Sequence, residues 1–164
     1  MKHYVGIRNY ITVIHDIKFW QSHLLTVVYS AISVVLVNIL AFALAYAVTG
    51  KVKGKNFFRA GLFTPNLIGG LVLGYIWQFI FSRAMVAVGS DLNIGFLETS
   101  WLSDPKMAVV ALIIVSVWQY SGFMMLIYIA GLTSVPKELI EAGVIDGCGK
   151  TQVLKNIILP QMRS

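Results

Sequence analysis

The residue types that carry out enzyme chemistry occur in this sequence, but their spacing assembles no catalytic or metal site. The serines of the apolar stretches have no histidine or carboxylate in register to activate them: Ser30, Ser33, Ser116 and Ser121. There is no GxxxxGK(S/T) nucleotide loop and no HExxH metal motif. His3, His15 and His23 precede the first apolar run, and Cys148 is the single cysteine. The sequence therefore predicts a protein that is not an enzyme and holds no metal or cofactor.

A dense group of charged and turn-forming residues lies near the carboxyl end, in ELIEAGVIDGCGKTQVLKNIILP (138–160). A helix is expected from Val135 to Asp146, with Ser134 as its N-cap. Pro136 suits the first turn of such a helix, and Glu138 suits the positive end of the helix dipole. This segment is therefore expected to be a short, well-defined helix.

Two further features are expected to complete the segment. Gly147 is placed to end the first helix in a left-handed conformation. A second short helix is expected over 151–158, before Pro160 interrupts the pattern. The apolar side chains of the first helix could lie on lipid, pack on their own bundle or enter a groove of a partner: Leu139, Ile140, Val144 and Ile145.

Outside this segment, most of the chain is apolar. Of its 164 residues, 57% are hydrophobic and 12% are charged, about half the charge of an ordinary soluble domain. Uncharged runs cover about 24–48, 60–82 and 107–131, each long enough for a membrane-spanning helix. A soluble core is the alternative, but a chain of this length could not cover three such helices. The expected fold is an all-α integral membrane domain over 1–164, with three spans and a loop over about 132–160.

The charges between the runs predict the direction of the spans. The connection GKVKGKNFFR carries four basic residues and no acid: Lys51, Lys53, Lys55 and Arg59. The 83–106 connection carries three acids against two basic residues. By the positive-inside rule the first connection is cytoplasmic and the second external, so 132–160 is cytoplasmic. Aromatic residues near the ends of the runs are expected to anchor them at the interface: Phe57, Phe58, Trp77, Phe79, Phe81 and Trp101. No nucleic-acid-binding motif accompanies the basic cluster, so a nucleic-acid partner is not expected.

Four amides lie within the apolar runs or near their ends: Asn38, Asn66, Gln78 and Gln119. Because an amide that faces lipid is costly, they are expected to face other helices or a water-filled cavity. They could make interhelical hydrogen bonds or line a solute pathway. No ionisable residue lies deep in a run, which disfavours a proton-coupled secondary transporter.

The spacing of the carboxyl-terminal segment resembles a known motif. Glu141-Ala142-Gly143 is followed after three residues by Gly147 and after nine more by IILP (157–160), which is similar to the EAA, x3, G, x9, I-x-L-P pattern. That pattern belongs to the cytoplasmic loop of permease subunits in binding-protein-dependent ABC importers. Gly143 replaces the second alanine of the motif, a change between small residues that still permits close approach. VGIRNYITVIHDIKFW, WLSDP and SVWQYSGFMMLIYIAGLTSVPKELIEA also resemble the carbohydrate-type permeases, such as those for maltose, glycerol phosphate and raffinose.

The resemblance implies a role and a set of partners. In this family the loop forms a coupling helix that docks on a cytoplasmic ATP-binding subunit. Glu141, Ala142, Gly143, Asp146 and Gly147 would be its contact or turn residues, and Leu139, Ile140 and Val144 its packing residues. The other implied partners are a second permease subunit, an extracytoplasmic solute-binding protein and the lipid bilayer. The chain would import a sugar or related solute across the bacterial plasma membrane by alternating access, driven by ATP hydrolysis elsewhere.

Permeases of this kind usually carry about six spans, so three spans correspond to part of the family fold. The family's first helix would precede VGIRNY and two more would follow ILP. We therefore expect a fragment or a truncated reading frame. The alternative function is a non-transporting membrane interaction protein, or an inactive remnant of such a permease. The identity of the solute does not follow from these residues.

Overall fold

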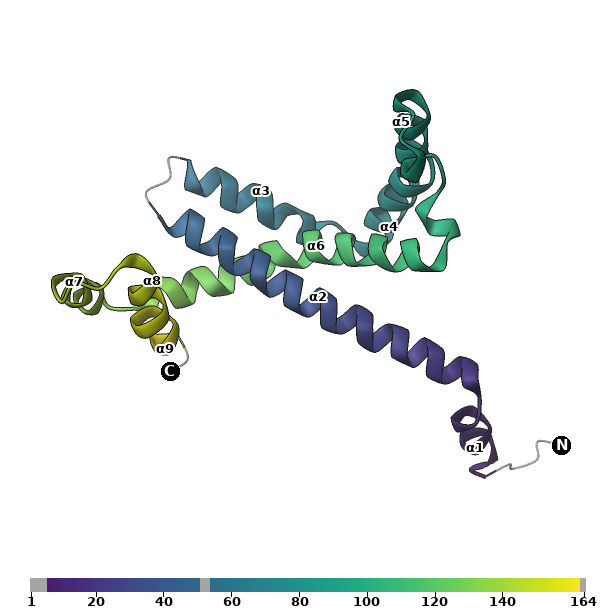
Figure 1. Cartoon of the computed structure of the whole chain (residues 1–164), viewed down its shortest axis with the longest axis horizontal. Helices are drawn as coiled ribbons and strands as arrows, with labels where there is room; N and C mark the ends of the chain where they lie inside the picture. Colours follow the sequence, from purple (N-terminus) through teal and green to yellow (C-terminus); the bar gives the residue numbers. More distant parts are fainter. Residues whose placement is uncertain (1–5, 51–53, 163–164) are drawn as a thin grey trace.

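The computed structural model describes residues 6–50 and 54–162, with only the backbone at positions 56 and 58. Lys51 and Lys53 of the basic cluster lie outside the described residues, as does the side chain of Phe58. Within the described part of the chain every regular element is a helix, which confirms the all-α class (Figure 1).

The first apolar run lies inside one long helix. A short helix, α1 (Arg8–Ile14), precedes α2 (Ile17–Thr49). The carboxylate of Asp16 caps α2 by accepting a hydrogen bond of 2.9 Å from the backbone N–H of Lys18. This cap explains why α2 begins at Ile17, well before the uncharged run at 24: local hydrogen bonding, and not apolarity, sets where the helix starts.

The second apolar run does not form one helix. It is divided between α3 (Lys55–Leu67) and α4 (Gly70–Phe79) by the extended backbone of Ile68 and Gly69. From α4 the chain continues through the π-helical turn η1 (Ile80–Ala84) into α5 (Met85–Leu92). Together these elements form a continuous helical stretch, so the helix long enough to span is 70–92 and not 60–82.

The break has an identifiable cause in the sequence. Pro65 lies inside α3 and has no N–H to continue the hydrogen-bond ladder, and the glycine pair Gly69-Gly70 follows at once. Apolarity continues across the break because both helices have apolar surfaces. A hydropathy pattern indicates that a segment lies in an apolar environment, but it does not indicate where the chain changes direction.

The third apolar run lies inside α6 (Pro105–Ser134). The turns η2 (Gly95–Leu97) and η3 (Trp101–Ser103) lead into it from α5. The Asp104 carboxylate caps its first turn by accepting hydrogen bonds from the N–H groups of Lys106 and Met107, at 2.8 and 3.0 Å. Three stretches are therefore long and apolar enough to cross a membrane: Ile17–Thr49, Gly70–Leu92 and Pro105–Ser134.

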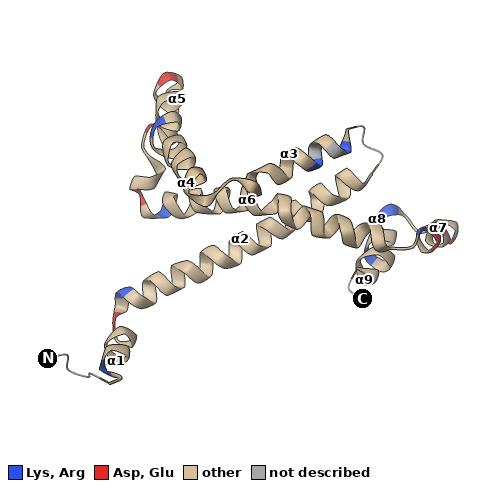
Figure 2. Cartoon of the chain, turned by 180° about the vertical axis from the view of Figure 1, so that it is seen from behind, with Lys and Arg blue, Asp and Glu red and all other residues tan. Residues whose placement is uncertain are grey.

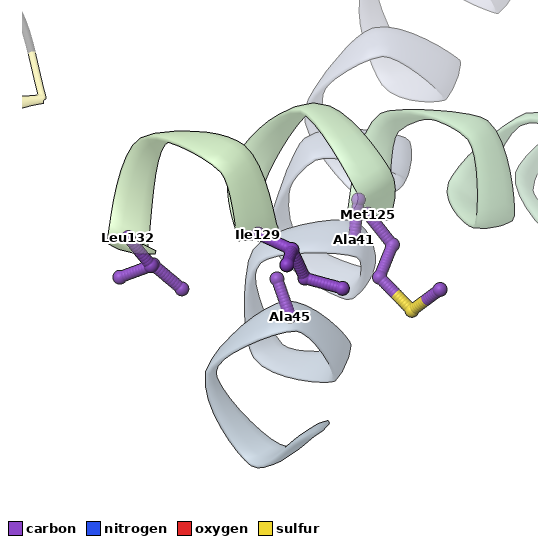
Figure 3. Close-up of a cluster of buried hydrophobic side chains, with 5 residues drawn as sticks. All are labelled: Ala41, Ala45, Met125, Ile129 and Leu132. Carbon is purple, nitrogen blue, oxygen red and sulfur yellow. The ribbon is translucent and has the colours of Figure 1, made fainter. Parts of the chain in front are cut away.

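The core lies where α2 crosses α6. It consists of buried apolar side chains from the carboxyl-terminal halves of both helices, drawn in Figure 3: Ala41, Ala45, Met125, Ile129 and Leu132. The two alanines allow close approach of the helix backbones, as small residues do between membrane helices. The helix α3 packs on α6 more closely still, because a methyl group at Gly122 would overlap the carbonyl oxygen of Leu62. The crossing of α3 and α6 thus depends on this glycine.

The carboxyl-terminal segment folds as α7 (Lys137–Ile145), α8 (Lys150–Val153), the π-helical turn η4 (Leu154–Ile158) and α9 (Leu159–Gln161). Two expectations for it are wrong. Ser134 ends α6 and donates to the carbonyl of Gly131 at 2.8 Å, while Pro136 takes the N-cap position of α7. Pro160 does not end the second helix, because the wider π-turn before it changes the hydrogen-bond register that a proline disrupts.

The arrangement agrees with the expected sidedness. The end of α2, the start of α3 and the group α7–α9 lie at one end of the molecule, and α1 and α5 lie toward the other (Figure 1). Charged residues lie at the ends of the long helices, in the short helices and in the connections, whereas the middle parts of α2, α4 and α6 carry none (Figure 2). The described helices thus have an apolar middle zone bounded by charged ends, as a membrane-spanning bundle requires.

Candidate docking helix and intramembrane groove

The helix α7 has a firmly defined carboxyl end. Gly147 has φ of +83° and so takes the left-handed conformation expected of it. The N–H of Cys148 donates to the carbonyl of Gly143 at 2.9 Å, and the N–H of Gly147 donates to that of Val144 at 3.1 Å. These two bonds make a Schellman motif, which satisfies carbonyls that a helix end would otherwise leave free.

One face of α7 is open to a partner. Glu138, Glu141, Ala142 and Ile145 follow at spacings of three, one and three residues, so they share a face, and all four are exposed. The side chain of Ile145 is 84% exposed, which is unusual for an isoleucine on a helix of this length. Sequence reasoning placed Glu141 and Ala142 at a contact but did not include Ile145 among the contact residues. Helical spacing from Glu141 was the signal that could have found it.

The opposite face packs through a glycine. Gly143 is the buried residue of α7, and a methyl group there would overlap the Cδ1 of Ile157 in η4. Of the three residues expected to supply packing, Ile140 is half-buried, whereas Leu139 and Val144 are 40% and 60% exposed. Within the described chain, therefore, α7 is held mainly by the fit of Ile157 against Gly143. Asp146, at the C-cap, is exposed and donates its backbone N–H to Ala142.

The returning helix connects this contact to the long helices. Ile158 and Met162 pack on the core cluster of α2 and α6. The Cε of Met162 would lie 2.9 Å from a methyl group at Gly131, so the carboxyl end of α6 is in close contact with it. Val135, between α6 and α7, is buried as well. α7 is therefore connected to α6 both through the chain and through side-chain packing.

A groove of about 540 Å³ lies between α2, α3 and α6, toward the middle of the apolar zone. Its lining combines aromatic rings with hydroxyl and amide groups: Tyr29, Ser30, Ser33, Val34, Val37, Asn38, Asn66, Ser116, Tyr120, Phe123 and Met124. An apolar groove with a few polar groups is the usual composition of a small-molecule site. It contains no charged side chain, so it suits an uncharged polar solute better than an ion.

Two of the four amides take the roles left open for them, and Gln78 and Gln119 lie elsewhere. Asn38 makes an interhelical hydrogen bond, because Tyr128 donates its hydroxyl to the Asn38 Oδ1 at 2.6 Å, and it also lines the groove. Asn66 lines the groove from α3. Gln78 lies in a separate shallow depression on α4, and Gln119 is half-buried on α6 outside the groove lining.

Several groove residues were missed by sequence reasoning. The hydroxyls of Tyr29 and Ser116 lie 2.5 Å apart and join α2 to α6. Ser33 stands one turn from Tyr29, and Tyr120 one turn from Ser116, so each helix turns a stripe of hydroxyl groups toward the groove. The Ser33 Oγ is buried beside the groove without a hydrogen-bond partner. This i, i+4 spacing of hydroxyls was the available signal.

In the described ranges no three side chains among His, Cys, Asp and Glu come close enough to hold a metal ion. The candidate site consists of α7 and the groove, and α6 connects the two.

Comparisons with known proteins give consistent results. The family model described as binding-protein-dependent transport system inner membrane component matches residues 38–164. The chain is 39% identical, over 96% of its length and 53% of the relative's, to the probable starch degradation products transport system permease protein AmyD of Thermoanaerobacterium thermosulfurigenes. It is 38% identical, over 97% of its length and 55% of the relative's, to the multiple sugar-binding transport system permease protein MsmF of Streptococcus mutans. The chain thus spans about half the length of these curated relatives.

A solved structure supports the fold. The chain superposes on a chain of a bacterial ABC transporter involved in the import of the acidic polysaccharide alginate, with a TM-score of 0.84 and 19% sequence identity. The match covers 98% of this chain and 57% of the other. At this identity the similarity shows a shared arrangement of helices.

Proposed function

Because this chain belongs to the family of binding-protein-dependent transport system inner membrane components, a family of membrane permeases, we propose that it forms part of the translocation unit of an ABC importer. Its residues 1–164 form one transmembrane domain in this proposal. The transported solute is a sugar or a related solute, as the names of the relatives at 38 and 39% identity suggest. The uncharged groove lined with hydroxyls and amides supports the same solute class.

The observation that carries the proposal is the build of α7. A short helix at one end of the molecule is closed by the Schellman motif at Gly147, fixed by Gly143 against Ile157, and exposes Glu141, Ala142 and Ile145. Such a helix offers a partner a defined surface and passes its displacement to α6. We propose that this partner is a cytoplasmic ATP-binding subunit.

The remaining proposed roles follow from position. Asp146 and Gly147 form the turn that ends α7, and Gly143 sets its distance from η4. Leu139 and Val144, which are exposed here, and Ile140 would pack against the ATP-binding subunit or a second permease subunit. An extracytoplasmic solute-binding protein would deliver the solute at the end of the molecule that carries α1 and α5.

The proposed mechanism needs no chemistry from this chain. ATP binding and hydrolysis on the separate subunits would displace α7, and α6 would carry the displacement to the groove, which Ser116 and Tyr120 line from the same helix. The groove would thereby open alternately to the two sides of the membrane.

Co-purification tests the docking face. Glu141→Lys reverses a charge at the centre of the exposed face, and we expect it to abolish co-purification with the cognate ATP-binding subunit while membrane insertion stays intact. Glu98→Lys makes the same change in an exposed residue at the other end of the molecule and is expected to leave co-purification unchanged. If Glu141→Lys co-purified as well as Glu98→Lys, Glu141 would have no docking role.

Uptake tests the function itself. Cells that carry the whole locus should accumulate labelled oligosaccharide, and deletion of this subunit should abolish the accumulation. Normal uptake without the subunit would instead favour the non-transporting interaction protein.

A further inference from the structure

The amino-terminal helix α1 has a surface that the transport function does not use. It contains no buried residue. Ile7, Ile11 and Ile14 follow at spacings of four and three residues, so they share one face, and Tyr10 lies beside them. Their side chains are exposed, at 71% for Ile7 and 72% for Tyr10. Isolated exposed apolar residues need no explanation, but a whole exposed apolar helix face does.

The other face of α1 is polar. Arg8, Asn9, Thr12 and His15 lie on it. The Thr12 hydroxyl donates to the carbonyl of Arg8 at 3.0 Å, and the Nδ1 of His15 lies 2.8 Å from the carbonyl of Ile11. These local bonds leave the polar face directed at water. The helix is therefore amphipathic, with the polar face opposite an apolar face that Tyr10 and Val13 widen on one side.

The junction with α2 fixes where α1 lies. The Nε1–H of Trp20 donates to the carbonyl of Ile14 at 2.7 Å and so attaches the end of α1 to the first turn of α2. The rings of Phe19, Trp20 and His23 contact one another, with centroids 5.5 to 6.1 Å apart. Tryptophan with one polar and one apolar side is typical of the membrane–water boundary. The ring cluster thus marks that boundary on α2.

The apolar face of α1 continues the exposed surface of a spanning helix. Ile17, at the junction, is 72% exposed, and Leu24 on α2 is 64% exposed. Exposed apolar residues therefore follow one another from Leu24 through Ile17 to Ile14 and Ile11, with the polar side chains of Gln21 and Asp16 between them at the boundary that the rings mark. A protein partner is a poorer fit, because a stable protein interface covers about 800 Å² on each side, more than one two-turn helix offers.

We propose that α1 is an interfacial helix that lies in the headgroup layer of the bilayer, with Ile7, Ile11 and Ile14 directed at the acyl chains. Such helices bury an apolar face to a depth of about 5 to 10 Å while the polar face stays in water. Held there through the Trp20 bond, α1 fixes the depth and tilt of the outer part of α2. This role rests on the membrane location of the chain and not on the proposed solute.

Depth-dependent quenching tests the proposal. In a Cys148→Ala background, Ile11→Cys and Thr12→Cys place an environment-sensitive fluorophore on the two faces of α1 in the full chain. The protein is reconstituted into phosphatidylcholine–phosphatidylglycerol vesicles. Nitroxide on the lipid headgroup should quench most of the fluorescence at position 11 and little at position 12. Iodide in the buffer should show the reverse order.

Two results would overturn the proposal. Equal quenching of both positions by iodide would show that α1 stands in water. Protection of position 11 from both nitroxide and iodide would show that a protein surface covers it. A label at Val35, exposed in the middle of α2, gives the fully lipid-facing reference. The measurement needs no transport activity, so its failure can be told apart from failure of the proposed function.

Discussion

Replacing Gly143 by alanine tests whether Ile157 holds the docking helix in place. The methyl group would lie well inside the roughly 3.5 to 4.0 Å at which carbon atoms pack, but only with respect to the Cδ1 of Ile157. The next neighbours, Val153 Cγ2 at 3.8 Å and Ile157 Cγ1 at 3.9 Å, would be in ordinary contact. The free-energy cost of Gly143→Ala therefore depends on whether this one terminal methyl group of Ile157 can move.

Two opposed effects set how much Gly143→Ala weakens the contact between α7 and η4. Overpacking costs about 1 to 3 kcal/mol, and alanine in a helix is about 0.5 to 1 kcal/mol better than glycine. Because Ile157 is half-buried, its Cδ1 can rotate away, which places the cost in the lower half of that range. We expect Gly143→Ala to weaken the contact between α7 and η4 by about 1 kcal/mol, a factor of about five in its opening equilibrium.

The single cysteine of the chain provides the assay. Cys148 is half-buried, and its N–H donates to the Gly143 carbonyl in the motif that closes α7. Its rate of maleimide labelling in native membranes therefore reports how often the end of α7 opens. Gly143→Ala should raise that rate about fivefold. Gly61→Ala is the matched control, because a methyl group there meets nothing within 4 Å and lies far along the sequence in α3.

A double variant separates overpacking from other effects. Ile157→Val removes the overlapping Cδ1 and, at a half-buried site, should cost about 0.5 kcal/mol or little more. With Gly143→Ala added, the overlap is gone and the helix-propensity gain remains, so the double variant should label at close to the wild-type rate. The coupling between the two sites is then about 1 to 2 kcal/mol. Additive effects of the two substitutions would refute the argument that Ile157 fills the space beside Gly143.

The other glycines give two further predictions. Gly122→Ala should destabilise the fold by at least the roughly 1 to 3 kcal/mol typical of overpacking, because a backbone oxygen of Leu62 cannot rotate away, and should therefore lower the thermal unfolding midpoint in detergent. Gly74→Ala, where the methyl group meets nothing within 4 Å, should leave the midpoint unchanged. Equal midpoints for the two variants would contradict the α3–α6 contact. Gly147→Ala should destabilise the carboxyl end of α7 by about 1 to 2 kcal/mol, because alanine is strained in the left-handed conformation, and should therefore accelerate Cys148 labelling. Unchanged labelling would show that the end of α7 does not need φ of +83°.

The sequence predicts the fold class well because long uncharged runs admit few structures other than membrane helices. The runs over 24–48 and 107–131 lie inside α2 and α6 as expected. The run over 60–82 was wrongly expected to be a single span, because hydropathy is the same on both sides of the break at Ile68 and Gly69. Pro65 was recognised as a candidate kink, but the turn itself depends on how α3 packs against α6.

In the segment α7–α9, too, local features could be predicted from the sequence and long-range contacts could not. Left-handed Gly147 followed from local geometry, which a single residue type can indicate. The burial of Gly143 and the exposure of Val144 did not follow, because they depend on where η4 packs against α7. The groove lining needed the relative rotation of α2 and α6, which single-sequence patterns do not contain. Contacts between distant segments are therefore what the sequence left undetermined.

Those long-range contacts converge on α6. Near its middle, α6 contacts α3 at Gly122 and lines the groove with Ser116 and Tyr120. Near its end it contacts the returning helix through Gly131 and Met162. At 30 residues and about 1.5 Å per residue, α6 extends roughly 45 Å as one helix without an internal proline or π-turn. A rotation imposed at its cytoplasmic end must therefore appear at the groove, since no break in α6 could absorb it. In the proposed mechanism, the extended backbone between α3 and α4 would let the surrounding helices adjust to that rotation.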